Sequence, residues 1–130
     1  MLHHGVDLIE IGRIRRAIER WGERFLSRIY TEEERRRYES RVQELAVRFA
    51  GKEAVMKALG TGRRGISWRD IEILSDDSGK PRVLLRGGAR RRASELGLED
   101  IEISLSHSRE MAMASAIGIS GGRDEAPQGG

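Results

Sequence analysis

The sequence predicts an α+β fold with a largely antiparallel sheet packed against helices. Two observations favour this class. A strand, a turn and a second strand are expected over residues 68–74, 76–81 and 82–85, and strand-like runs at 101–106 and 111–119 follow them. Helical segments lie between the strands without the strict alternation of a parallel α/β sheet, so the helices are expected to cover one side of the sheet.

Composition restricts the function classes. The chain has no cysteine, which excludes disulfides, thiolate catalysis and cysteine-based zinc sites. No apolar run is long enough to span a membrane, and the N-terminus lacks the pattern of a secretion signal. We expect a cytoplasmic protein without membrane attachment. It should form one domain over residues 1–119, with a flexible, apolar-poor tail over 120–130.

The N-terminal elements are predicted from periodicity and capping. Residues 6–11 are rich in branched side chains and read as a strand. Residues 13–25 carry apolar side chains at three- and four-residue steps, which predicts one helix. The buried stripe of this helix is expected to be Ile14, Ala17, Ile18, Trp21 and Phe25. Thr31 and Glu34 have the spacing of a capping box, so a short helix through residue 38 should follow.

The next predicted helix spans residues 42–59 and carries the side chains of greatest chemical interest. It should stop at the glycines of residues 60–62. After the hairpin, a helix over residues 89–96 should end at Gly97, and the two final strands should complete the sheet.

Glu53 and Lys57 lie one turn apart on this central helix. With a rotation of about 100° per residue, both flank its apolar stripe, beside the small side chains of Ala46 and Ala50. An ordinary exposed ion pair, worth about 0.2–0.5 kcal/mol, has the same spacing. If Asp7 of the first strand approaches Glu53, however, two close carboxylates require a cation or a shared proton. Magnesium is the expected ion, because it takes few protein ligands and commonly binds substrate phosphates.

Two further features are less specific. His107 opens a polar turn after a strand, where it can meet a ligand, although a hydrogen-bonded turn histidine gives the same pattern. Gly60, Thr61 and Gly62 can present backbone amides to a phosphate, although glycines after a helix are also a simple stop signal. This segment is not a P-loop, because the Gly-Lys-Ser/Thr ending is absent.

Three segments together carry a family resemblance. They are residues 5–14 (GVDLIEIGRI), 48–62 (RFAGKEAVMKALGTG) and 103–108 (ISLSHS). In order and separation they closely resemble the holo-acyl-carrier-protein synthases of the 4'-phosphopantetheinyl transferase superfamily, with further agreement at residues 70–73 and 79–81. The resemblance therefore covers most of the chain and also implies the phosphopantetheinyl transferase fold.

The resemblance implies an enzyme that transfers 4'-phosphopantetheine from coenzyme A to a serine of apo-acyl carrier protein and releases adenosine 3',5'-bisphosphate. By match of motif, the metal residues would be Asp7 and Glu53, which would hold Mg²⁺ against the pyrophosphate, and Lys57 would complete the catalytic set by neutralising phosphate charge. The base that takes the serine proton is either Glu53 or a water on the metal.

The same resemblance assigns the binding residues and the assembly. Coenzyme A would be contacted by Arg48, Lys57, Gly60, Thr61, Gly62, His107 and Ser108. The chain would form a homotrimer with active sites between neighbouring subunits. The acidic carrier protein would dock on a basic face made of the matching positions Arg13, Arg24 and Arg28, to which helix geometry adds Arg16 and Arg20.

Two other functions compete with this prediction. The pI near 9.8 would suit a non-catalytic module that binds nucleic acid, but the chain has few aromatic side chains for base stacking, so we expect no nucleic-acid partner. A structural subunit with this fold and no catalysis is the third possibility. The intact set of Asp7, Glu53 and Lys57 argues against it.

Overall fold

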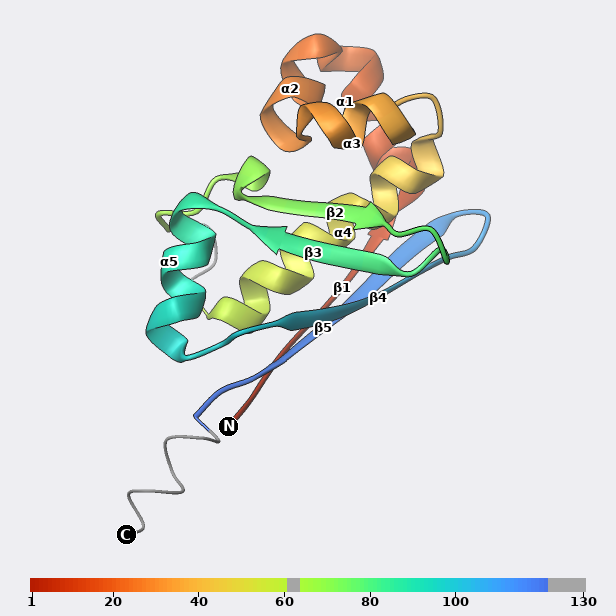
Figure 1. Ribbon diagram of the computed structural model, residues 1–130. Helices are drawn as coiled ribbons and strands as arrows, with labels where there is room; N and C mark the ends of the chain where they lie inside the picture. The colour runs from red at the N-terminus through yellow and green to blue at the C-terminus, as the bar shows by residue number, and fades with distance from the viewer. Residues whose placement is uncertain (61–63, 122–130) are drawn as a thin grey trace, which may run out of the picture.

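The structure, a computed structural model, describes residues 1–60 and 64–121 and confirms the predicted α+β class. Strands β1 (Leu2–Glu10), β5 (Met111–Ile119) and β4 (Ile101–His107) form an antiparallel sheet in the order β1-β5-β4. Strands β2 (Ile71–Ser75) and β3 (Pro81–Leu85) form the predicted hairpin. Figure 1 shows helix α4 lying between the three-stranded sheet and this hairpin.

The central helix forms as predicted. Helix α4 spans Val42–Leu59 and ends where Gly60 adopts a left-handed conformation with φ 79°. It contributes more buried residues to the core than any other element, and it is buried on nearly all sides. Strand β1 approaches it closely at Gly5, where a Cβ atom would lie 2.0 Å from the carbonyl oxygen of Ala54. Glycine is therefore required at this crossing.

The helix predicted over residues 13–25 is wrong as a single element. The chain forms α1 (Ile11–Trp21) and α2 (Glu23–Ile29), separated by Gly22 with φ 54° and ψ −126°. Residues with side chains rarely adopt this conformation, and the helical periodicity of the sequence concealed the break. Helix α3 (Glu32–Tyr38) follows with the predicted capping box at its start.

Smaller differences concern element boundaries. The predicted strand over residues 68–74 begins with a 3₁₀ turn, η1 (Trp68–Asp70), because the Ser67 hydroxyl accepts the Arg69 amide and the Asp70 carboxylate accepts the Ser67 amide. Helix α5 (Gly87–Leu96) starts two residues earlier than predicted and ends at Gly97 as expected. Ser120 still pairs with Met1, just past the predicted end of the domain, while most of the predicted tail lies outside the described residues.

The two faces of the three-stranded sheet differ in character. Side chains that point toward α4 are buried, whereas those on the opposite face of β1 and β5 are exposed and largely apolar. The large members of this outer apolar face are Leu2, Val6, Leu8, Met113, Ile117 and Ile119. Within the described part of the chain, no helix is long and apolar enough to cross a membrane.

Candidate active site

The structure brings Asp7 and Lys57 into contact across the β1–α4 packing. The Lys57 Nζ atom lies 3.1 Å from Asp7 Oδ1 and donates a hydrogen bond of 2.9 Å to the Val6 carbonyl oxygen. The Asp7 side chain is 15% exposed and that of Lys57 is 54% exposed, so the pair lies at the surface. The close crossing at Gly5 fixes this geometry, because it holds β1 against the last turns of α4.

Glu53 lies one turn before Lys57 on the same flank of α4 and is half-buried. Strand β1 and α4 run in opposite directions (Figure 1). Asp7, which follows Gly5 on β1, is therefore displaced from the Gly5 crossing toward the N-terminal side of α4, the direction in which Glu53 lies. Two carboxylates and an ammonium group therefore project from neighbouring elements. These hard oxygen donors suit magnesium, which keeps several waters and needs few protein ligands. The described residues contain no cluster of three or more potential ligands, as a metal held by protein alone would require.

A second polar site lies on the other side of α4. A cavity of about 210 Å³ is bounded by α4, the turn of the β2–β3 hairpin and the end of β4. Arg48 and His107, two predicted coenzyme A contacts, both line it, together with Gly79, Pro81 and Ser106. Sequence reasoning did not assign Gly79 and Pro81 to a site, although the family resemblance at residues 79–81 was a signal for them.

Arg48 is held almost entirely by protein groups. Its side chain is buried and donates to the Ile73 carbonyl oxygen at 2.9 Å, to Glu44 Oε1 at 2.6 Å and to Ser75 Oγ at 3.0 Å. The guanidinium also lies 3.5 Å from the centre of the Tyr38 ring. Arg48 thus contributes to the wall of the cavity mainly as a structural cation, and its contact with coenzyme A remains a prediction.

The other predicted coenzyme A contacts are only partly placed. Ser108 is exposed in the turn between β4 and β5, where its hydroxyl accepts a hydrogen bond from the Met111 amide at 3.1 Å. Gly60 follows α4 and is exposed. Thr61 and Gly62 lie outside the described residues.

The two sites lie on opposite sides of one chain. Arg48 and Lys57 are separated by about 180° around α4, at 100° per residue. On the sheet, Asp7 belongs to the outer strand β1 and His107 to the outer strand β4, with β5 between them. Two strand spacings amount to about 10 Å. Two partial sites are therefore present, on opposite sides of α4.

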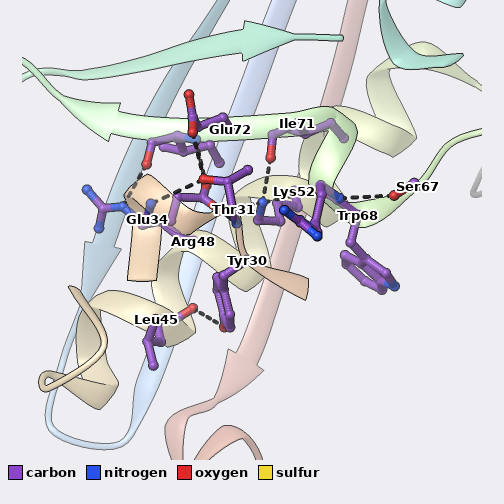
Figure 2. A network of polar contacts seen from close by, with 12 residues as sticks. Tyr30, Thr31, Glu34, Leu45, Arg48, Lys52, Ser67, Trp68, Ile71 and Glu72 are labelled. Atoms are coloured by element: carbon purple, nitrogen blue, oxygen red, sulfur yellow. Dashed lines mark hydrogen bonds and ion pairs between the residues drawn. The ribbon is translucent and has the colours of Figure 1, made fainter. Parts of the chain in front are cut away.

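A buried ionic network supports this region, and sequence reasoning missed it. Lys52 and Glu34 are fully buried, and the Lys52 Nζ atom lies 2.8 Å from Glu34 Oε1 (Figure 2). The Lys52 ammonium also donates to the carbonyl oxygens of Trp68 and Ile71. Burial lowers the pKa of Lys52, while the nearby Glu34 carboxylate opposes that shift. Lys52 is three residues from the core side chain Phe49, and a lysine at such a buried helical position was the available signal.

The network joins three elements of the fold. The other Glu34 oxygen accepts the Ile73 amide at 2.7 Å, and Thr31 donates its hydroxyl to Glu72 Oε2 at 2.6 Å. Arg86 donates a hydrogen bond of 3.2 Å to the other Glu72 oxygen, Oε1. Helix α3, helix α4 and strand β2 are thus fixed to one another beside the residue that precedes Glu53.

The predicted docking arginines lie on α1 and α2 and are largely exposed: Arg13, Arg16, Arg20, Arg24 and Arg28. None of them forms an ion pair with a carboxylate of residues 1–60 or 64–121. The arginines of α3 differ, because Arg35 pairs with Glu23 and Glu39, and its neighbours pair with Glu33. The positive charge of these α1 and α2 arginines is therefore available to a partner.

Comparisons with known proteins agree with this architecture. The sequence-family model of the 4'-phosphopantetheinyl transferase superfamily matches residues 4–115 of this chain. A holo-[acyl-carrier-protein] synthase of Herpetosiphon aurantiacus is 48% identical, over 92% of this chain and 99% of that protein.

Solved structures give the same result. The holo-[acyl-carrier-protein] synthase of Neisseria meningitidis superposes with a TM-score of 0.84 and 34% identity, covering 91% of this chain and 98% of that one. The Bacillus anthracis synthase in complex with CoA (3',5'-ADP) has a TM-score of 0.76 and 34% identity, covering 92% and 96%. The predicted resemblance is confirmed: the chain belongs to the 4'-phosphopantetheinyl transferase superfamily, with the holo-[acyl-carrier-protein] synthases as its relatives.

Proposed function

We propose that this enzyme transfers 4'-phosphopantetheine from coenzyme A to a serine of apo-acyl carrier protein in a Mg²⁺-dependent reaction. The observation that carries the proposal is the contact of Lys57 with Asp7, one helical turn from Glu53, in a member of this family. The related B. anthracis structure in complex with CoA (3',5'-ADP) supports coenzyme A as the donor and adenosine 3',5'-bisphosphate as the product.

Each residue has a role that follows from its position. Asp7 and Glu53 would hold the magnesium ion, which supplies charge neutralisation at the pyrophosphate when bound. Lys57 is exposed, so its ammonium can reach a phosphate oxygen that gains negative charge as the bond to the leaving group breaks. The serine oxygen forms the new bond to phosphorus, its proton leaves to a base, and the bisphosphate carries away the electron pair. The base that accepts this proton is either Glu53 or a water that the metal would hold.

We further propose that the functional unit is a homotrimer with active sites between subunits. One chain places the Asp7 site and the His107 cavity on opposite sides of α4, so a single ligand can use both when they come from neighbouring copies. The outer apolar face of the sheet supports this assembly, because large exposed apolar faces of this kind are usually covered in oligomers. Copies of this chain are the occupant that the proposal requires.

The activity is tested by incubating the protein with coenzyme A, Mg²⁺ and apo-acyl carrier protein and weighing the carrier by mass spectrometry. The expected result is a mass gain of one phosphopantetheine arm, which EDTA abolishes and added Mg²⁺ restores. No gain with several bacterial carrier proteins would reject the proposed transfer. A gain that survives EDTA would reject the metal dependence alone.

The shared-site arrangement is tested with two inactive variants, Asp7→Asn and His107→Ala. Refolded or co-expressed together, they should regain part of the wild-type activity, because some interfaces then combine an intact Asp7 with an intact His107. Light scattering should give the mass of three chains. Two variants that assemble together but stay inactive would show that both residues act from the same subunit.

A further inference from the structure

Trp21 occupies an unexpected position at the end of α1. The periodicity of the sequence places it in the buried stripe, but the structure leaves 47% of it exposed. Helix α1 ends at this residue, and Gly22 turns the chain into α2. Phe25 of α2 then packs inward, with its ring 6.2 Å from that of Tyr30 and 6.3 Å from that of Phe49. The indole of Trp21 is left outside the core.

The indole is flanked by two cations. The guanidinium carbon of Arg20 lies 4.9 Å from the ring centroid, and that of Arg24 lies 5.8 Å away. Such contacts orient the ring, but they do not remove it from water. Among the described helical residues, Trp21 is the only exposed large apolar side chain; the others lie on strands or at the N-terminus. An ordered, exposed indole within a cationic surface is a feature of a contact site, because interface hot spots are enriched in tryptophan and arginine.

We infer that Trp21 is the apolar anchor of the carrier-protein docking surface on α1 and α2, an inference that rests on the proposed function. The partner must present carboxylates to Arg20 and Arg24 and an apolar side chain between them to cover the indole. An acidic helix with one apolar residue between acidic ones has this chemistry. The arginines accelerate and orient the encounter, while burial of Trp21 slows dissociation.

Fluorescence tests this contact without any chemistry. The chain has two tryptophans, and Trp68 is buried and stacked on Phe49 at 4.7 Å, so Trp68→Phe leaves Trp21 as the only reporter while keeping an aromatic ring in the core. Titration with apo-acyl carrier protein, followed in parallel by anisotropy of a labelled carrier, should shift Trp21 emission to shorter wavelength and reduce its quenching by acrylamide. Unchanged quenching at a carrier concentration that saturates the anisotropy would overturn the inference.

Kinetics provide the second test. Trp21→Ala should raise KM for the carrier about 10- to 30-fold, as truncation of a hot-spot residue does, and leave kcat, KM for coenzyme A and Tm nearly unchanged. Trp21→Phe should recover part of the loss. Leu84→Ala is the matched control, because Leu84 on β3 is also 47% exposed and has no assigned role.

The outcomes separate the two proposals. If the wild type transfers no phosphopantetheine, the proposed function fails. If the wild type is active and Trp21→Ala keeps its KM for the carrier, the anchor fails while the function stands. An equal loss in Leu84→Ala, or a loss confined to kcat and Tm, would also reject a docking role for Trp21.

Discussion

Lys52 and Lys57 lie little more than one turn apart on α4, yet their surroundings are opposite. Lys52 is 0% exposed, and its ammonium is surrounded by Glu34 Oε1 and two carbonyl oxygens. Lys57 is 54% exposed and touches Asp7 and the Val6 carbonyl oxygen at the surface. A lysine therefore stabilises the fold at position 52, whereas the lysine at position 57 remains accessible to a phosphate.

The difference follows from desolvation. A buried lysine must have its charge compensated completely by the protein, so it has no donor left for a ligand. An exposed lysine keeps its hydration at little cost and can exchange water for a phosphate oxygen. If this comparison is correct, changes at Lys52 affect stability first and changes around Lys57 affect transfer first.

The largest effect is expected from Lys52→Met. The substitution leaves the buried Glu34 carboxylate without its cation and removes the hydrogen bonds of Lys52 to the Trp68 and Ile71 carbonyl oxygens, which should lower the free energy of unfolding by about 3–5 kcal/mol. Urea denaturation measures this change. The double variant Lys52→Met/Glu34→Gln should recover part of the loss, because no uncompensated charge remains. A single variant within 1 kcal/mol of wild type would show that the buried pair does not fix the fold.

Glu53→Gln should produce the next largest effect, this time on chemistry. The amide keeps the shape of the side chain but removes the anionic oxygen proposed to bind Mg²⁺, so kcat/KM should fall about 10²- to 10³-fold. Tm should stay close to the wild-type value, which distinguishes this variant from Lys52→Met. Near-normal transfer at saturating Mg²⁺ would remove Glu53 from the mechanism.

Lys57→Gln should lower transfer somewhat less, by about 10²-fold, because one cation near the phosphates is lost while the metal residues remain. The loss should appear in kcat more than in KM for coenzyme A, since the charge is needed most when the phosphate bond breaks. Lys57→Arg is the matched variant that keeps the charge. If Lys57→Gln and Lys57→Arg were both as active as the wild type, Lys57 would not have the proposed role of neutralising phosphate charge.

The sequence was sufficient for some of these features and insufficient for others. Helix α4 could be predicted to the residue, because its apolar periodicity is continuous and Gly60 ends it. The family resemblance was needed to place Asp7, Glu53 and Lys57 in one site, and the direct contact of Asp7 with Lys57 was not predicted, since it joins elements far apart in the chain. The break at Gly22 was missed because apolar spacing continues across it, and Trp21 was misplaced in the core for the same reason.

The buried network shows a different limit. Glu34 was correctly predicted as a capping residue, but the cap uses only part of its hydrogen-bonding capacity. Its bonds to Lys52 and to the Ile73 amide depend on how α3 packs against α4 and β2. Local sequence patterns do not predict how helices pack. The capping role of Glu34 could therefore be predicted, but its tertiary contacts could not.

The smallest predicted effect is the stability change of Lys57→Gln. Surface ion pairs contribute about 0–1 kcal/mol, because water solvates both charges when the pair is broken, so the free energy of unfolding should change by less than about 1 kcal/mol. The dependence of these stability differences on ionic strength provides a second measurement. Raising ionic strength should reduce the small difference between Lys57→Gln and wild type, but leave the loss in Lys52→Met largely intact, since burial shields that pair from ions. A Lys57→Gln loss as large and as salt-resistant as that of Lys52→Met would mean that both lysines serve the fold, and the distinction between the two ends of this short segment would no longer hold.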